Sequence, residues 1–495
     1  MQRTASLPIF IEGHSSRRRG SGTLQEQIYR SVRQSIREGL AGADRRLPST
    51  RTLAKRLGVS RTTALLALEQ LRAEGYVVAR RGSGTFIAPR LPERLPPQVV
   101  PSGSAVARPP FSRRGLLLSQ LSAPDRRRSD VAPCAFRLGT PALDLFPQRI
   151  WAQITRECLR VRKPALLDYS KLAGLRSLRE AIAEQMQSRG TRCDADQVQV
   201  VTGAQRGLDL IARMLLDPGD HAWMEDPGYT GARGAMLAAS ATVVPVPVDA
   251  DGMVIGGNQS RHDVRLAYVT PSCQFPLGVA LSLARRHSLL AWARKSQAWI
   301  VEDDYDCDLR HEQRPLPCLH ALDPDGRVIY VGTFSKTLFP ALRLGFLIVP
   351  RDLQAGFVTA RLASEMHPPV LEQRVLEAFI ARGHYERHLR RMQAVYSERL
   401  DALTRAIERS GAPLRLRPVQ AGIHAVVDLE SVDAECVHHA ALARGIETMP
   451  LSAYYIGEGP RPNALLLGFG AVPPAALRAG VSRLARVIET LMREG

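Results

Sequence analysis

Apolar residues near the start of the chain recur with the period of an α-helix in three short segments. The predicted helices span residues 24–39, 50–57 and 61–74, with Ser49 or Thr50 and then Ser60 as caps. In the third helix, Leu65, Leu68 and Leu71 are expected to face inward. Residues 75–87 read as two short strands around a glycine-bearing turn. This order predicts a winged helix-turn-helix, a module whose recognition helix can enter a DNA major groove.

From Phe136 onward, short apolar strands alternate with amphipathic helices, which is typical of an α/β fold with a largely parallel sheet. The predicted strands are Val198–Val201, His221–Met224, Val264–Val269, Trp299–Val301, Val328–Val331 and Leu344–Val349. A helical stretch at 370–409, two further apolar runs at Ile423–Leu429 and Ala464–Leu467, and a helix at 474–492 predict a smaller α+β subdomain.

Residues 89–133 separate these two regions and show little periodicity. They are rich in Pro, Arg and Ser, a composition that is typical of a linker. A chain of 495 residues is also too long for a single core. We therefore expect a DNA-binding domain at 1–88 that begins with a loose arm, a linker at 89–133 and a larger domain at 134–495.

The positive charge is concentrated at the front. Residues 1–90 carry 17 Lys or Arg and 6 Asp or Glu, which is +11 of the total net charge of +19. A small, strongly basic module next to a larger region of lower net charge indicates a polyanionic partner, although a basic face is often only solvated.

Cysteine usage and hydropathy bear on the compartment. The seven cysteines include no CxxC pair, so we expect reduced thiols with neither disulfides nor a metal site. The first residues lack an apolar signal segment, and no run is long enough to span a bilayer. A cytoplasmic protein without a membrane partner is expected.

Lys336 is the residue on which the chemistry of the larger domain depends. The chain has five lysines among 67 basic residues, and Lys336 lies in the connection between the apolar runs at 328–331 and 344–349. Unlike arginine, a desolvated lysine can lose its proton and form a Schiff base with a carbonyl. By itself, Lys336 would be read as an ordinary loop residue.

Other residue types near predicted strand ends strengthen the functional interpretation. Gly203 and Ala204 open a helix, where backbone N–H groups suit a phosphate. Tyr229 follows a strand and could stack on a flat ligand, although core packing is the simpler explanation. Asp303 carries a carboxylate to the sheet edge, and Arg343 can neutralise a phosphate. Together with Lys336, these residues fit pyridoxal phosphate.

The front of the chain resembles the GntR class of bacterial regulators over about residues 24–88. The matching segments are Leu47–Arg51, Leu57–Thr63, Leu71–Gly75 and Arg81–Thr85. The resemblance implies that DNA is contacted by Arg51, Arg61, Thr62 and Thr63, with Gly82 and Gly84 at the tip of the wing. Leu65 departs from the pattern, because some relatives carry a DNA-contacting arginine there. The alternative is a winged helix that binds only protein.

Residues 134–492 resemble fold-type-I aminotransferases. The motifs that carry this resemblance are Thr333-Phe-Ser-Lys-Thr337, Glu302-Asp-Asp-Tyr305, Asp226-Pro-Gly-Tyr229 and Asp168-Tyr169 with Gly174 and Leu178-Arg179. The resemblance implies that Lys336 forms the Schiff base with pyridoxal 5′-phosphate, Asp303 pairs with the ring nitrogen and Tyr305 bonds the ring hydroxyl. It also implies a stacking role for Tyr229, phosphate contacts from Gly203, Ala204, Thr333 and Arg343, and a Tyr169 that reaches across from another subunit.

A GntR-type head on an aminotransferase-like body resembles the MocR family of regulators end to end. The PdxR-type branch of that family is one candidate for this chain. Such regulators are commonly head-to-tail homodimers that bind promoter DNA and sense the cofactor itself, an amine or an amino acid. Two positions depart from working aminotransferases: Phe275 replaces an asparagine, and Leu466 replaces the arginine that clamps a substrate carboxylate. We therefore favour a regulator over the alternative, an active aminotransferase that carries a DNA-binding head.

Overall fold

The computed structural model describes residues 23–37, 44–80, 82–92, 111–119, 121, 134–160, 168–256, 263–309 and 317–494. The predicted arm before residue 23 and most of the predicted linker at 89–133 lie outside these ranges. The chain forms two compact units, Met1–Pro109 and Pro110–Gly495, which are described one at a time.

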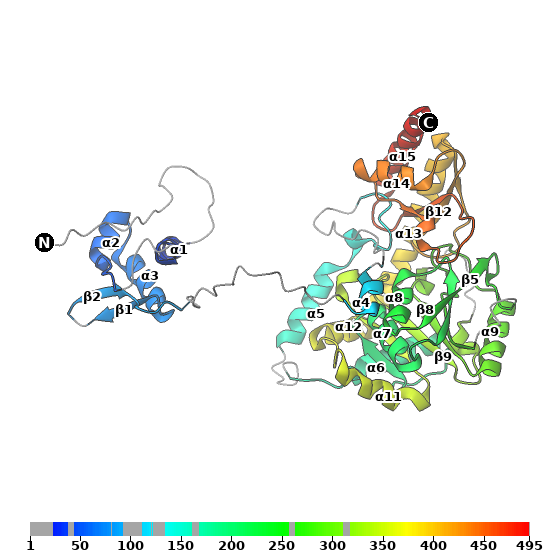
Figure 1. Ribbon diagram of the computed structural model, residues 1–495, viewed down its shortest axis with the longest axis horizontal. Coiled ribbons are helices and arrows are strands. Elements are labelled where there is room, and N and C mark those ends of the chain that lie inside the picture. The colour runs from blue at the N-terminus through cyan, green and yellow to red at the C-terminus, as the bar shows by residue number, and fades with distance from the viewer. Residues whose placement is uncertain are drawn as a thin grey trace. The chain divides into compact units, whose positions relative to one another are not determined.

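The first unit is a winged helix-turn-helix (Figure 1). Its elements are α1 (Leu24–Arg37), α2 (Thr50–Leu57), α3 (Arg61–Ala73), β1 (Val77–Arg80) and β2 (Gly84–Ile87). As predicted, Ser49 and Ser60 cap α2 and α3, and the Ser60 hydroxyl accepts a hydrogen bond from Thr63 N at 3.0 Å. Strands β1 and β2 pair antiparallel and form the wing.

The prediction that Leu65 faces inward is wrong. The buried residues of α3 are Ala64, Ala67, Leu68 and Leu71, whereas the side chain of Leu65 is 42% exposed. The core face of this helix begins one residue earlier than the leucine spacing suggests. Two of its core positions are alanines, which contribute little to a hydrophobic pattern, so the pattern of leucines alone predicted the wrong face.

An eight-stranded sheet organises the second unit (Figure 1). Its strands, in spatial order, are β3 (Val198–Val201), β10 (Gly345–Ile348), β9 (Val328–Thr333), β8 (Trp299–Asp304), β7 (Val264–Val269), β4 (His221–Asp226), β5 (Thr242–Asp249) and β6 (Gly252–Met253). Strands β9, β8, β7, β4 and β5 are parallel, while β10 runs antiparallel to both of its neighbours. The parallel strands bring their carboxyl ends to one edge.

Helices cover both faces of this sheet. On one face, α7 (Ala204–Leu215), α8 (Thr230–Ala238) and α11 (Gln354–Ala360) pack against residues such as Ile329 and Val331 of β9. Val328 and Tyr330 point to the opposite face, because side chains alternate along a strand. The helices there are α5 (Gln148–Arg160), α6 (Arg176–Ser188), α9 (Leu283–Ser296), α10 (Leu319–Leu322) and α12 (Val370–Ala381).

A short helix from the predicted linker also packs on this unit. Helix α4 (Arg113–Ser119) lies against α8, where Arg114 Nη1 donates to the carbonyl of Ala238 at 3.3 Å. A Cβ atom at Gly234 of α8 would lie 3.0 Å from the side chain of Leu121, so a glycine there leaves room for that leucine.

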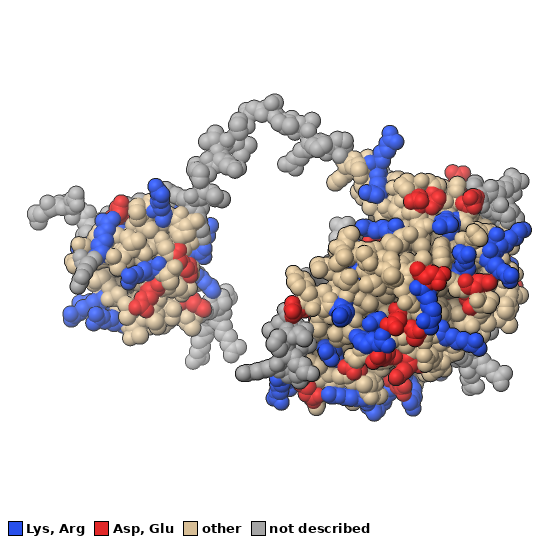
Figure 2. All heavy atoms as spheres, turned by 90° about the horizontal axis from the view of Figure 1, so that it is seen from below, with Lys and Arg blue, Asp and Glu red and all other residues tan. Residues whose placement is uncertain are grey.

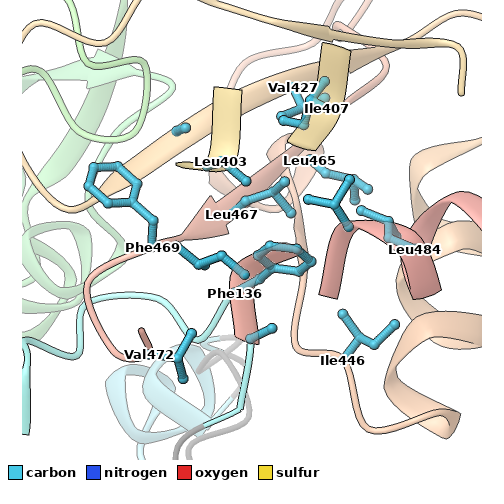
Figure 3. Packing of buried hydrophobic residues seen from close by; sticks show 14 of the residues in the cluster. Phe136, Leu403, Ile407, Val427, Ile446, Leu465, Leu467, Phe469, Val472 and Leu484 are labelled. Atoms are coloured by element: carbon cyan, nitrogen blue, oxygen red, sulfur yellow. The ribbon is translucent and has the colours of Figure 1, made fainter. Parts of the chain in front are cut away.

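The C-terminal part is an α+β subdomain. Its antiparallel sheet has the order β11 (Leu414–Leu416), β12 (His424–Leu429), β14 (Ala464–Gly468) and β13 (Met449–Pro450). Helices α13 (His384–Ser410), α14 (Ala434–Ala443) and α15 (Pro474–Glu494) contribute to the core on one side of it. Figure 3 shows Leu465, Leu467 and Phe469 pointing into this core together with Phe136 from the start of the unit.

Charges of both signs are interspersed on the visible surface of the second unit (Figure 2). On the face seen in Figure 2, Lys and Arg side chains lie beside Asp and Glu. Within the described ranges, no helix has the length and apolar composition needed to cross a membrane.

Candidate cofactor and DNA sites

Lys336 lies just beyond the carboxyl end of β9, in the connection that leads to β10. Its side chain is partly buried, and Nζ donates to the carbonyl of Gly139 at 2.9 Å. Gly139 has φ +66°, and a Cβ atom there would lie only 2.5 Å from Nζ. A glycine at this position therefore lets the backbone approach the amine closely.

Asp303 occupies the neighbouring strand β8 on the face covered by α7 and α8. It is 5% exposed and accepts a hydrogen bond from the Tyr268 hydroxyl at 2.8 Å. Burial raises the pKa of Asp303 to about 7, although Tyr268 and the charge of Lys336 act in the opposite direction. The adjacent Asp304 points to the other face, where it accepts from Tyr330 at 2.6 Å.

Aromatic rings converge beside these two residues. Phe275 stands edge-on to Tyr229 and to Tyr305, with ring centroids 6.0 Å apart in each pair. The Tyr229 hydroxyl donates to Gln205 Oε1 at 3.2 Å, and the Tyr305 hydroxyl donates to Cys273 Sγ at 3.6 Å. Phe275, Tyr229 and Tyr305 therefore form a cluster of flat rings, a kind of surface that suits a planar ligand.

The start of α7 provides features of an anion site. Gly203 is its N-terminal flanking residue with φ +83°, and no side chain in the described part of the chain caps the helix there. Gly345 approaches closely enough that a Cβ atom would lie 3.0 Å from Ala204 N, and the guanidinium of Arg343 lies beside Gly203. Thr333 ends β9, and its hydroxyl accepts from Ser335 N at 3.2 Å. Backbone N–H groups and an arginine suit a phosphate.

One residue proposed from the sequence does not join this cluster within a single copy. The side chain of Tyr169 is 79% exposed, and its ring lies 6.1 Å from that of His367.

Sequence reasoning missed two buried partners. Tyr268 binds Asp303, and Glu225 accepts from Thr270 Oγ1 at 2.6 Å and from Gln274 Nε2 at 3.3 Å. Burial raises the pKa of Glu225 to about 7. Tyr268 stands inside the predicted strand Val264–Val269, and Glu225 directly follows the predicted strand His221–Met224. The only available signal was therefore a polar group within or next to an apolar run.

The helix pair of the first unit presents the residues proposed to bind DNA. Arg51 near the start of α2 and Arg61 and Thr62 at the start of α3 are exposed. Thr63 is partly buried, and its hydroxyl lies 2.7 Å from Ser60 Oγ, so it also supports the helix cap.

The wing turn contains Gly82 (φ +77°) and Gly84 (φ +107°), and both are exposed. Arg46, which sequence reasoning did not single out, extends its guanidinium along Gly84, where a Cβ atom would come within 3.0 Å of Nε.

Two protein families match the chain. Residues 24–87 match the bacterial regulatory proteins of the gntR family, and residues 138–484 match the aminotransferases of class I and II. Among solved structures, α-aminoadipate aminotransferase LysN from Thermus thermophilus, complexed with N-(5′-phosphopyridoxyl)-L-leucine, has a TM-score of 0.71 and 27% identity. That match covers 78% of this chain and 98% of the other.

Curated relatives match along nearly the whole length. The probable rhizopine catabolism regulatory protein MocR of Rhizobium meliloti is 39% identical, with 95% of each chain covered. The pyridoxine biosynthesis transcriptional regulator PdxR of Corynebacterium glutamicum is 31% identical, over 96% of this chain and 97% of the relative. Together with the two domain matches, these similarities show that the chain belongs to the MocR-like transcriptional regulators, in which a GntR-type helix-turn-helix domain precedes an aminotransferase-like domain.

Proposed function

We propose that this regulator binds pyridoxal 5′-phosphate at Lys336 and senses either that cofactor or an amine or amino acid. The observation that carries the proposal is the juxtaposition of Lys336, just beyond the end of β9, and Asp303, near the end of the adjacent parallel strand β8. The charge of Lys336 acts on the pKa of Asp303, so the two groups lie within electrostatic reach of each other. The α7 terminus beside Arg343 supplies a phosphate site on the same side of the sheet.

The residues present fit this cofactor. When bound, it supplies an electrophilic carbonyl carbon and an electron-withdrawing ring. Lys336 is the amine that attaches to it, and Asp303 is the buried acid that keeps a ring nitrogen protonated. Tyr305 can donate to a ring hydroxyl, and Tyr229 offers a flat surface. For the phosphate we propose Gly203, Ala204, Thr333 and Arg343.

We propose that the first unit binds promoter DNA through α3. The exposed residues Arg51, Arg61 and Thr62 can reach base edges, and Thr63 lies at the start of the same helix. Gly82 and Gly84 allow the wing to approach the sugar-phosphate backbone closely, because neither carries a side chain.

A head-to-tail homodimer in the cytoplasm is the form in which we propose that the protein acts. The exposed side chains of Tyr169, Leu159 (60%) and Leu362 (58%) leave apolar surface that a second copy would cover. Tyr169 would then reach the cofactor site of the other copy. The proposed division of the chain into 1–88, 89–133 and 134–495 follows the change from the winged helix to the α/β region.

We propose that the aminotransferase-like domain senses a ligand and does not catalyse repeated transamination. Leu466 is fully buried in strand β14 at the position where aminotransferases carry an arginine for the substrate carboxylate. Without a bidentate partner, an amino acid is not held in the orientation that proton abstraction from its Cα requires.

Replacement of Lys336 by alanine tests the proposal. The wild type should be yellow, and borohydride reduction should fix the cofactor on the peptide that contains Lys336. Lys336→Ala should lose the visible absorbance while the circular dichroism of the protein stays unchanged. Lys295→Ala, which removes an exposed lysine of α9, is the matched control.

DNA binding is measured on the same proteins with the region upstream of the gene, with and without added cofactor. Operator affinity should respond to the cofactor in the wild type and in the control, but not in Lys336→Ala. Trapping of the cofactor on another lysine would overturn the proposed site.

A further inference from the structure

The two positions that differ from working aminotransferases belong to one apolar cluster. We call this cluster the apolar wall; it comprises Val426, Leu451, Tyr454 and Leu466, with Leu138 and Phe275 packed against them. Leu466 is completely buried, and its register neighbours are Val426 on β12 and Met449 on β13. The two positions at which aminotransferases carry the asparagine and the arginine therefore lie in the same apolar cluster of this chain.

The geometry of strand β14 explains why Leu466 belongs to the apolar wall and not to the core of the C-terminal subdomain. Its neighbours Leu465 and Leu467 point into the core of the C-terminal subdomain, as Figure 3 shows. Successive side chains of a strand point to opposite faces, so Leu466 points away from that core. A polar side chain at position 466 would thus leave the core packing of Leu465 and Leu467 in place and change only the wall.

The wall adjoins the Lys336 site in two places. Leu138 precedes Gly139, whose carbonyl accepts the hydrogen bond from Lys336 Nζ. Phe275 packs edge-on against Tyr229 and Tyr305 on one side and against Tyr454 of the wall on the other, where the ring centroids are 5.1 Å apart. A molecule bound at Lys336 would therefore lie close to the apolar wall.

The charges around the site disfavour an anion away from the phosphate position. Asp306 is 2% exposed, and within the described residues neither of its carboxyl oxygens has a hydrogen-bond partner. The charge of Lys336 acts on both Asp303 and Asp306. Arg137, which is next to Leu138, is engaged by Glu447 through two contacts of 2.8 Å. A buried carboxyl group without a hydrogen-bond partner in the described part of the chain, such as that of Asp306, attracts a cation and repels a carboxylate.

We infer that the effector recognised at the Lys336 site is a primary amine without a carboxylate, with its carbon skeleton against the apolar wall. This inference rests on the proposed cofactor site at Lys336. An ammonium group is drawn toward the buried carboxyl group of Asp306, whereas a carboxylate against the wall would lose its water without gaining a hydrogen-bonded cation.

Matched pairs of ligands test the inference on the full-length protein loaded with pyridoxal 5′-phosphate. The pairs are 2-phenylethylamine with L-phenylalanine and butylamine with L-norvaline, in which the members differ only by the carboxylate. Binding is followed by calorimetry and by the shift in thermal unfolding. Each amine should bind at least about tenfold more tightly than its amino acid, a ratio equivalent to about 1.4 kcal/mol. Equal or tighter binding of the amino acids would overturn the inference, as would no binding of either member.

A substitution then ties the preference to the wall. Leu466→Arg supplies the missing cation, so the amine-to-acid affinity ratio should fall by at least about tenfold. Met492→Arg adds the same charge on exposed α15 and should leave the ratio unchanged. If Leu466→Arg does not fold, the wild-type ratio still decides the question.

Failure of the cofactor proposal looks different from failure of this inference. In the first case, borohydride reduction and mass spectrometry find no cofactor on Lys336. In the second case, the cofactor is on Lys336 and the amino acids bind as well as the amines.

Discussion

The substitution Asp303→Asn should change the stability of the cofactor-free protein and its affinity for cofactor in opposite senses. The variant keeps the size of the side chain and an oxygen that can accept the 2.8 Å hydrogen bond from Tyr268. It removes only the charge of a carboxyl group that is 5% exposed. The two effects have separate physical origins and can be measured separately.

The stability effect follows from the raised pKa. Burial raises the pKa of Asp303 from 3.8 to about 7, and a group with a raised pKa stabilises the fold only while it holds its proton. This stabilisation is complete below about pH 4 and is lost as the pH rises toward 7. A shift of about three units, at about 1.4 kcal/mol each, sets an upper limit of about 4 kcal/mol. Above pH 7, Asp303→Asn should therefore be more stable than wild type by on the order of 2–4 kcal/mol.

The cofactor effect has the opposite sign. A protonated ring nitrogen beside an ionised Asp303 forms a buried charge pair, and removal of one partner costs about 3–5 kcal/mol. The affinity for pyridoxal 5′-phosphate should therefore fall by roughly two to four orders of magnitude.

Urea unfolding of the cofactor-free protein at pH 5 and pH 8, with absorbance titrations of the cofactor, measures both effects. Asp304→Asn is the matched control, because Asp304 points to the opposite face of β8 and binds Tyr330. The control should leave cofactor affinity unchanged. A cofactor-free Asp303→Asn variant that is less stable than wild type at pH 8, or one that binds cofactor as tightly as wild type, would refute the reasoning.

Three other results are expected. Alanine at Arg51 or Arg61 should weaken operator binding by about 1–3 kcal/mol in anisotropy titrations at matched salt, and a double variant with full affinity would rule out the proposed DNA contacts. Ser60→Ala removes the acceptor for Thr63 N and should destabilise the start of α3 by about 1 kcal/mol, seen as faster hydrogen exchange of that helix; unchanged exchange would contradict the role of the cap. Because Leu466 cannot clamp a carboxylate, assays with common amino donors and keto acids should detect no steady turnover, and sustained turnover would favour the enzyme alternative.

The parts of the fold that could be predicted from sequence are those in which one periodicity dominates. The strands β3, β7 and β9 are mainly apolar runs, and their positions were predicted to within two residues. Strand β5 was missed because Pro245 and Pro247 interrupt it. These prolines are two residues apart, so their missing N–H groups face the same edge of the strand, which the sheet tolerates near its border.

Some residues of the candidate site could be predicted from the sequence, whereas the contacts between them could not. Lys336 and Asp303 stand in short motifs at strand ends, so the residue types and their order were visible in the sequence. The contact of Tyr268 with Asp303 and the shared packing of Phe275 and Leu466 join segments that are distant along the chain. Such contacts depend on sheet order and strand alternation, which a single sequence does not contain.

The packing of α4 on α8 has a thermodynamic consequence. Helix α8 begins directly after Tyr229 and ends at Ala238, whose carbonyl accepts a hydrogen bond from Arg114 of α4. About 14 Å of helix therefore separates an aromatic ring of the proposed cofactor site from the segment that follows the DNA-binding unit. Any coupling energy carried by this helix acts equally in both directions. A cofactor that tightens operator binding by some factor must itself be held more tightly, by that same factor, when the operator is occupied. If the protein acts as proposed, promoter DNA would be an effector of the cofactor site.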